Sequence, residues 1–207
     1  MKVAFGVKAH SGWAALVVLG KRDGDLVVVD RRRVGLVEED WAKQPYHTAA
    51  VLKPDAAGDV VKRGVEAAHR IALREMCGAV RGEKERENEV TACAVLVGSP
   101  MPDWSIEEIL AVHFRLHKAE GVLFREALAH ATTACGLRLV AIPEKLLTSY
   151  AERALGIPAI DLVKKVTVLG KAFGAPWGKD QKDAALAALV ALQESAKRGG
   201  MPPGPTR

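Results

Sequence analysis

The sequence has 207 residues, of which 49% are hydrophobic and 27% are charged, and its formal net charge is +5 at pH 7. This length allows one well-buried core, and the composition excludes a disordered or fibrous chain. A small basic excess permits nucleic acid or another polyanion as a partner, but it is common in proteins that bind neither, so charge alone assigns no partner. No segment approaches the roughly 18 to 20 apolar residues that a membrane span needs, so we expect no membrane association.

Three cysteines, Cys77, Cys93 and Cys135, lie in apolar or helical surroundings and show no CxxC spacing. An odd number of cysteines in such surroundings predicts buried free thiols in a reducing compartment. The first residues, MKVAFGVKAHSGW, lack the long apolar region of a signal peptide. We therefore expect a soluble, cytoplasmic protein.

Three short apolar runs open the chain. Residues 3–9 and 13–20 are separated by His10-Ser11-Gly12, and residues 25–37 follow the turn Asp23-Gly24. Short apolar segments joined by such turns predict an antiparallel meander of three strands.

Helices and two more strands are expected in the rest of the chain. Residues 38–58 contain several prolines and glycines and predict a long loop, and the charged residues 81–88 predict a solvated loop or helix end. Ser105 and Glu108 have the spacing of a capping box. The other predicted elements are a helix over 59–80, a buried strand over 91–99, a helix from 106 to about 134 interrupted near Gly121, a buried strand over 137–143, helices over 144–155, 160–170 and 179–196, and a disordered tail over 197–207.

This order of elements predicts an α/β domain over residues 1–196 with a mixed five-stranded sheet and helices on both faces. Strand–helix–strand crossovers that follow a meander produce such a sheet. The strand over 91–98 is apolar on both faces, which only a central position requires. We therefore expect strand 3–9 in the centre, with 13–20 on one side, 91–98 on the other and 137–142 beyond.

Three stretches of the chain resemble the RuvC Holliday-junction resolvases of the RNase H-like superfamily. AFGVKAHSG is similar to the opening strand and turn in which that family places its first catalytic aspartate. KAEGVLFREALAHATTACGLRLVAIPEKLL resembles the family's long helix and the strand after it. GKDQKDAALAALVAL resembles the final helix, where two aspartates three residues apart precede an Ala/Leu-rich face. Together these stretches touch about half the chain, and the resemblance implies an RNase H-like fold and a role in processing nucleic acid.

In the resolvases, four carboxylates bind two divalent cations that flank the scissile phosphate, one activating water and the other stabilising the leaving oxygen. Asp180 and Asp183 match the final pair of carboxylates. Lys8 stands at the position of the first aspartate, and Leu96 or Val97 falls where the central strand supplies a glutamate. The resemblance therefore implies that Lys8 approaches Asp180 or Asp183, and we expect no nuclease activity from this pair alone. The alternative is that the aspartates only favour the dipole of the last helix.

His113, His117 and Glu120 fall on one helix face, where they interrupt an apolar stripe. Buried charges are costly unless they are paired or bind a metal, and His-x3-His is a known metal-ligand spacing. The three residues therefore predict a divalent-cation site, with Mg²⁺ or Mn²⁺ expected before Zn²⁺, and Glu120 is also a candidate catalytic residue. We expect Tyr46 or His47 to cover them. The alternative is that the stripe is exposed here or that the three side chains only hydrogen-bond to neighbouring elements.

Other polar residues are candidates for binding a substrate. The turn at His10 and Ser11 beside Lys8 has the character of a phosphate-binding turn, or else of a surface hairpin. Tyr46 and His47 form a candidate lid or acid–base pair, or else belong to an ordinary loop, and Lys179 adjoins the aspartates. The run Arg31-Arg32-Arg33 alternates across a strand and favours a solvated edge over a nucleic-acid-binding stripe.

Three functions remain open at this point. The first is a metal-dependent phosphodiesterase acting on nucleic acid, with a site rebuilt from Asp180, Asp183, His113, His117 and Glu120. The second is a catalytically inactive RNase H-like binding or scaffolding protein in which Lys8 replaces the lost cation. The third is a nucleotide- or phosphate-binding protein that uses the turn over residues 10–12. A homodimer is compatible with each of them.

Overall fold

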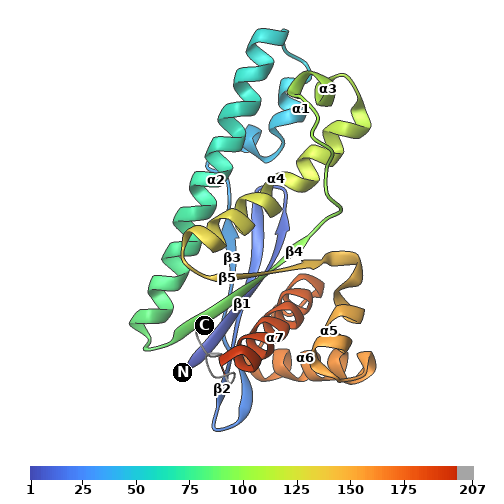
Figure 1. Cartoon of the computed structure of the whole chain (residues 1–207). Coiled ribbons are helices and arrows are strands. Elements are labelled where there is room, and N and C mark those ends of the chain that lie inside the picture. The colour runs from blue at the N-terminus through green and yellow to red at the C-terminus, as the bar shows by residue number, and fades with distance from the viewer. Residues whose placement is uncertain (200–207) are drawn as a thin grey trace, which may run out of the picture.

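The computed structural model describes residues 1–199, and within them five strands form one mixed sheet (Figure 1). The strands are β1 (Lys2–His10), β2 (Trp13–Arg22), β3 (Asp25–Gly35), β4 (Glu89–Val97) and β5 (Arg138–Pro143). Their order is β3-β2-β1-β4-β5. β1 pairs antiparallel with β2 and parallel with β4, and β4 pairs parallel with β5. The predicted order, with strand 3–9 between 13–20 and 91–98, is confirmed.

Helices cover both faces of this sheet. The helices within residues 1–199 are α1 (Pro45–Ala49), α2 (Pro54–Glu85), α3 (Ile106–Leu110), α4 (His113–Ala134), α5 (Leu147–Leu155), α6 (Ala159–Phe173) and α7 (Lys179–Gly199), with single 3-10 turns η1 (Asp40–Lys43) and η2 (Glu144–Leu146). One face packs against α2 and α4, and the other packs against α5, α6 and α7. The predicted α/β class with two covered faces is therefore confirmed.

The alternation of side chains along β1 distributes its residues between these two layers. Val3, Phe5 and Val7 join the core under α2 and α4, whereas Ala4 joins the core under α7. Successive side chains of a strand point to opposite faces, so a strand covered on both sides reads as a continuous apolar run. Lys8 belongs to the same set as Ala4 and Gly6 and therefore faces the α7 layer.

Gly6 allows α7 to pack unusually close to β1. A Cβ atom at this position would lie 1.9 Å from the carbonyl oxygen of Ala184 and 2.6 Å from the amide nitrogen of Ala188. The facing side of α7 consists of small, fully buried alanines. Backbone-to-backbone packing of this kind fixes where the first turn of α7 lies relative to the end of β1.

A group of helices lies beyond the ends of the strands. α1, α3 and the first turns of α2 and α4 lie together at the top of Figure 1. They enclose a small core of their own, which includes Tyr46, Val61, Ile109 and Leu116. We refer to this part of the molecule as the helical extension.

The helical extension corrects the prediction of one long loop over residues 38–58. That segment contains η1 and α1, and α2 begins at Pro54 rather than at residue 59. Pro45 and Pro54 both stand in the first turn of a helix, where the missing amide hydrogen costs nothing. The prolines were therefore helix starts and not loop markers.

The remaining boundaries differ in detail. The capping box of Ser105 and Glu108 is confirmed, with both hydrogen bonds present. The break in the following helix lies at Ala111 and Val112, where Val112 is extended, and not near Gly121. Residues 81–85 continue α2, and α7 reaches Gly199, three residues into the predicted tail. The rest of that tail, residues 200–207, lies outside the described residues.

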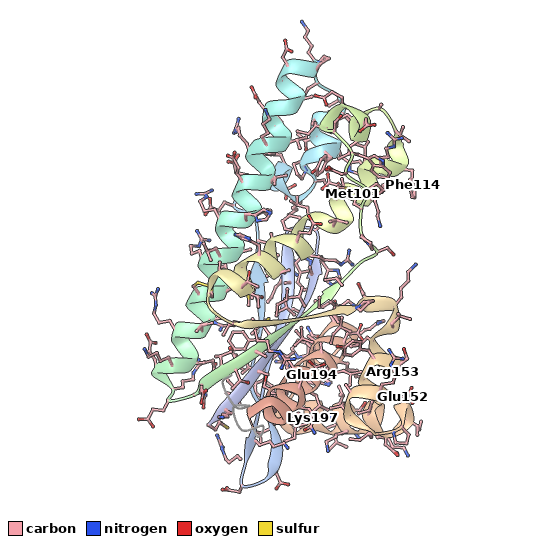
Figure 2. All side chains as sticks on the ribbon, viewed as in Figure 1. Met101, Phe114, Glu152, Arg153, Glu194 and Lys197 are labelled. Carbon is pink, nitrogen blue, oxygen red and sulfur yellow. A yellow bond between two sulfur atoms is a disulfide. The ribbon has the colours of Figure 1, made fainter. Side chains whose placement is uncertain are left out.

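Two of the three cysteines form a disulfide, so the prediction of three free thiols is wrong for them. Cys77 on α2 and Cys135 at the end of α4 are bonded, with their Cα atoms 5.5 Å apart, and Figure 2 draws the bond in yellow. Packing of α2 against α4 brings together residues that are 58 positions apart in the chain, which their local contexts do not reveal. Cys93 is buried and free, as predicted. Within residues 1–199, no helix is long and apolar enough to cross a membrane.

The close packing of α7 on β1 makes Gly6 sensitive to substitution. We expect Gly6→Ala to lower the free energy of unfolding by about 3 kcal/mol, because the added methyl group meets backbone atoms that cannot move independently. Gly35→Ala is the matched control, since a Cβ atom there has no heavy atom within 4 Å, and its expected effect is within about 0.5 kcal/mol. Urea unfolding of both variants measures the difference. Equal stability of the two would show that α7 does not pack on β1 in this way.

Candidate functional site

The ammonium group of Lys8 is buried among three carboxylates where β1, β5 and α7 meet. Its Nζ atom lies 2.7 Å from Asp183 Oδ2, 3.1 Å from Asp180 Oδ1 and 3.2 Å from Glu144 Oε1. The side chain of Lys8 is only 6% exposed. The expected approach of Lys8 to the two aspartates is confirmed, and Glu144 joins them. We call these four residues the Lys8 cluster.

Each carboxylate of the Lys8 cluster has a second partner. These contacts are Arg125 Nη2 to Glu144 Oε2 at 2.8 Å, His10 Nε2 to Asp180 Oδ1 at 3.1 Å, and Lys179 Nζ to Asp183 Oδ2. Three carboxylates therefore face three basic side chains, those of Lys8, Arg125 and Lys179. The negative charge of the cluster is compensated within the protein.

The pKa shifts follow from this arrangement. Burial by itself would lower the pKa of Lys8, but hydrogen bonds to Asp183, Asp180 and Glu144 outweigh burial and raise it above its ordinary value. Burial would raise the pKa of Glu144, yet Arg125 and Lys8 lower it overall. The pKa of Asp180 is likewise lowered by Lys8 and His10 against the effect of burial. Lys8, Glu144 and Asp180 are consequently charged at neutral pH.

The Lys8 cluster does not fit the pair of divalent cations that the resemblance implies. The ammonium group already lies within 3.2 Å of all three carboxylates, in the space that shared metal ions would need. The positions on β4 expected to supply a glutamate hold Leu96, which is fully buried, and Val97. An ammonium group supplies positive charge but cannot coordinate and activate water as a Lewis acid does.

Sequence reasoning missed two members of this site, Glu144 and Arg125. Glu144 is the first residue after the buried strand β5, and sites in α/β sheets form at the carboxyl ends of strands, so a signal for it was present. Arg125 gives no such signal. It lies on α4, on the other layer, and reaches Glu144 only because α4 crosses the end of the sheet.

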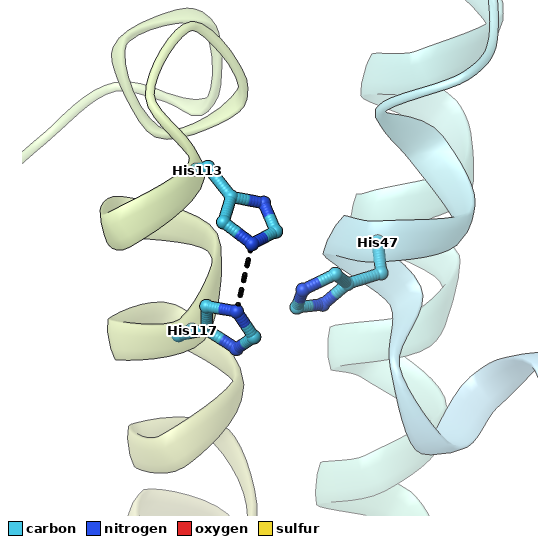
Figure 3. Close-up of side chains that lie close together, drawn as sticks. All are labelled: His47, His113 and His117. Atoms are coloured by element: carbon cyan, nitrogen blue, oxygen red, sulfur yellow. Dashed lines mark hydrogen bonds between the residues drawn. The ribbon is translucent and has the colours of Figure 1, made fainter.

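A second cluster, of three histidines, lies in the helical extension (Figure 3). His47 comes from α1, and His113 and His117 come from the first two turns of α4. The Nε2 atoms of His113 and His117 are 3.0 Å apart, and one ligand nitrogen from each of the three residues lies within 4.8 Å of the others. We call His47, His113 and His117 the histidine cluster.

Glu120, predicted as a metal ligand with His113 and His117, lies beneath α1 instead. Its Oε1 atom accepts hydrogen bonds from the backbone amides of Tyr46 at 2.8 Å and His47 at 3.1 Å. It is also 3.4 Å from Nδ1 of His47. Burial raises the pKa of Glu120 to about 7, although the two backbone hydrogen bonds oppose this shift. His47 therefore takes the third place in the cluster, and Tyr46 and His47 cover the site as expected.

The five residues expected to rebuild one metal site thus lie in two places, Asp180 and Asp183 in the Lys8 cluster and the others around His47. A polar depression of about 240 Å³ adjoins both groups, since it is lined by His10, Ser11, Glu120 and Arg125, among others. His10 and Ser11 form the predicted hairpin turn, with Gly12 at a φ of 78°. Binding of phosphate by this turn stays a prediction.

The three consecutive arginines of β3 serve different neighbours. Arg31 donates hydrogen bonds to the carbonyl oxygens of Gly174, Ala175 and Pro176, just before α7. Arg33 stacks on Trp13, with its guanidinium carbon 3.9 Å from the ring centroid. β3 is an edge strand of the sheet, and Arg32 and Arg33 are exposed, so the run lies on a solvated edge as predicted.

A groove of about 830 Å³ runs along the carboxyl ends of β4 and β5, next to the Lys8 cluster. Its charged lining residues are Lys118, Arg125, Lys145, Lys179 and a single acid, Glu144. His117 also lines it, so both clusters border the same groove. Lys145 and Lys179 are exposed. We call this feature the basic groove.

The Lys8 cluster should dominate the pH dependence of stability. We expect Lys8→Met to lower the free energy of unfolding by about 3 kcal/mol at pH 7, because three carboxylates lose their shared cation. A carboxyl group whose pKa is lowered by folding adds stability above its unfolded pKa and loses it as the pH falls through the folded value. The deficit of the variant should therefore shrink below about pH 4, and it should persist up to about pH 10 because the pKa of Lys8 is raised.

Denaturant unfolding from pH 3 to pH 9 measures this difference. Lys21→Met is the control, since Lys21 is an exposed lysine on β2, and it should stay within about 0.5 kcal/mol of the wild type at every pH. A deficit of Lys8→Met that did not change with pH would contradict the charge-based explanation.

Comparisons with known proteins agree with the sheet order and the covered faces. No protein-family model and no curated protein matches the sequence. Among solved structures, RuvC of Thermus thermophilus is similar with a TM-score of 0.50 and 15% identity over 95% of this chain and 96% of RuvC. The structure of T. thermophilus RuvC in complex with Holliday junction substrate aligns over 97% of both chains, with 14% identity and a TM-score of 0.49. The chain therefore has the RNase H-like fold of the RuvC resolvases.

Proposed function

We propose that this protein binds nucleic acid through the basic groove and does not hydrolyse it at the Lys8 cluster. The observation that carries the proposal is the juxtaposition of a groove lined by Lys118, Arg125, Lys145 and Lys179 with a charge-compensated cluster that lacks room for metal ions. Among the functions considered from the sequence, this one corresponds to an inactive RNase H-like binding protein.

The charge of the groove supports a polyanionic partner. Lys145 is exposed and makes no ion pair within residues 1–199, and Lys179 is exposed although it contacts Asp183. Lysine and arginine side chains supply most of the affinity for a phosphodiester backbone, since they neutralise phosphates and release counterions. The groove also lies at the carboxyl ends of parallel strands, where ligands of open α/β sheets bind. Similarity of fold to RuvC, a Holliday-junction resolvase, favours nucleic acid over other polyanions.

The chemistry of the Lys8 cluster supports binding without hydrolysis. Hydrolysis of a phosphodiester needs an activated water and stabilisation of the leaving oxygen. Lys8 has a raised pKa and stays protonated, so it cannot accept a proton from water. Glu144 and Asp180 have lowered pKa values and are held in ion pairs, which makes them weak bases. The residues at this centre thus favour charge complementarity over catalysis.

The basic groove can be tested by reversing one charge. The substrates are DNAs assembled from strands of about 30 nucleotides: a single strand, a duplex and a four-way junction. We expect Lys145→Glu to weaken binding of these DNAs and to reduce the slope of the logarithm of the association constant against the logarithm of salt concentration by about one. Lys84→Glu makes the same charge change at the end of α2, away from the groove, and should bind like the wild type. Fluorescence anisotropy at several salt concentrations gives both quantities. If the two variants bind equally well, the groove is not the binding surface.

A cleavage assay separates this proposal from a rebuilt phosphodiesterase. The wild type is incubated with the same labelled DNAs and with RNA in the presence of Mg²⁺ or Mn²⁺. We expect no cleavage that depends on Asp183. Cleavage by the wild type that Asp183→Asn abolishes would overturn the inactive assignment and support the phosphodiesterase instead.

A further inference from the structure

We propose that His47, His113 and His117 bind one late first-row divalent transition metal ion, with zinc the expected occupant. This inference does not depend on the proposed binding of nucleic acid. It concerns a place in the fold, between α1 and α4, that is separate from the Lys8 cluster. It also replaces the earlier expectation of a site built from His113, His117 and Glu120.

The spacing of the imidazole nitrogens supports a shared ion. Two histidine nitrogens bound to one tetrahedral zinc at 2.0 to 2.1 Å lie about 3.3 Å apart. The Nε2 atoms of His113 and His117 are 3.0 Å apart, so a small rotation of the rings reaches that separation. Residues four apart on a helix lie on the same face, which presents both rings to one point (Figure 3).

His47 completes the site from a different element. Its ring centroid lies 4.7 Å from that of His117 and 5.9 Å from that of His113. One ligand nitrogen from each of the three residues lies within 4.8 Å of the other two. Glu120 Oε1 is 3.4 Å from Nδ1 of His47, which leaves Nε2 of that ring for an ion. A carboxylate on the far nitrogen is the usual way in which a metal-binding histidine is oriented. Glu120 is therefore a positioning residue.

The donor set selects the class of metal. Three neutral imidazole nitrogens suit zinc and its neighbours in the transition series, whereas Mg²⁺ requires oxygen ligands in near-octahedral geometry. The order expected from the sequence, with Mg²⁺ or Mn²⁺ before Zn²⁺, is therefore reversed for this site. Three protein ligands leave a fourth position open, and exposed His113 and His117, the latter on the basic groove, make that position accessible to solvent.

The experiment measures binding of zinc and cobalt to the full-length chain without an affinity tag, in the absence of nucleic acid. We expect isothermal titration of Zn²⁺ to give one ion per chain. Co²⁺ should produce the visible absorption of a four-coordinate site. His117→Ala should lower zinc affinity at least about 100-fold, and Glu120→Gln, which keeps the shape of the side chain, should lower it about 10- to 100-fold. Bound zinc should raise the melting temperature of the wild type, since it joins α1 to α4.

His130→Ala is the matched control, because His130 is an exposed histidine on the same helix α4 but outside the cluster. It should bind zinc and cobalt like the wild type. Circular dichroism of every metal-free variant confirms that each is folded before its affinity is compared. If the wild type binds no stoichiometric zinc, the 3.0 Å contact is a hydrogen bond between two imidazoles and the proposal is wrong. Equal zinc affinity of His117→Ala and His130→Ala would equally overturn it, whatever the outcome of the nucleic-acid experiments.

Discussion

A lysine ammonium group buried among three carboxylates holds together elements from distant parts of the chain. Lys8 belongs to the first strand, Glu144 follows the last strand, and Asp180 and Asp183 begin the final helix. Burying such charges is favourable only when all of them are compensated, so the position of each element depends on the others. The close approach of α7 to β1 at Gly6 makes this compensation possible, because it brings the first turn of α7 over Lys8.

The contact of Lys8 with the three carboxylates is also the reason why we propose binding of nucleic acid without its hydrolysis. A cation in the middle of the carboxylates keeps the positive charge that metal ions would supply, yet it has no coordination sites for water or phosphate oxygen. Two cations of the basic groove, Lys118 and Lys145, make no ion pair with this compensated centre, and Lys145 is exposed. The proposed function depends on this difference between the cations of the groove, which can attract a phosphodiester backbone, and the Lys8 cluster, which has no Lewis acid to cut one.

The helical extension follows a different principle. Its small core, which includes Tyr46, Ile109 and Leu116, positions α1 against the start of α4. Glu120 on α4 also holds α1 in place, because it accepts hydrogen bonds from two backbone amides of α1. The ligand atoms that gather there are imidazole nitrogens, which favour a softer metal than the carboxylates of a resolvase centre do. Two clusters of opposite chemical character thus border one groove, each built on its own set of elements.

The sequence by itself determined the sheet, its strand order and the meeting of Lys8 with the two aspartates. The signals for them were short apolar runs separated by turns, a strand over 91–98 that is apolar on both faces, and a resemblance in three stretches. The apolar runs correspond to strands because the sheet is covered on both faces. The contacts of Arg125 with Glu144 and of Cys77 with Cys135 carry no local signal, and neither does the place of His47, rather than Glu120, as the third member of the histidine cluster. Only the tertiary structure decided them, because each depends on how α4 crosses the sheet and packs against α1 and α2, and no periodicity within a single segment encodes that crossing.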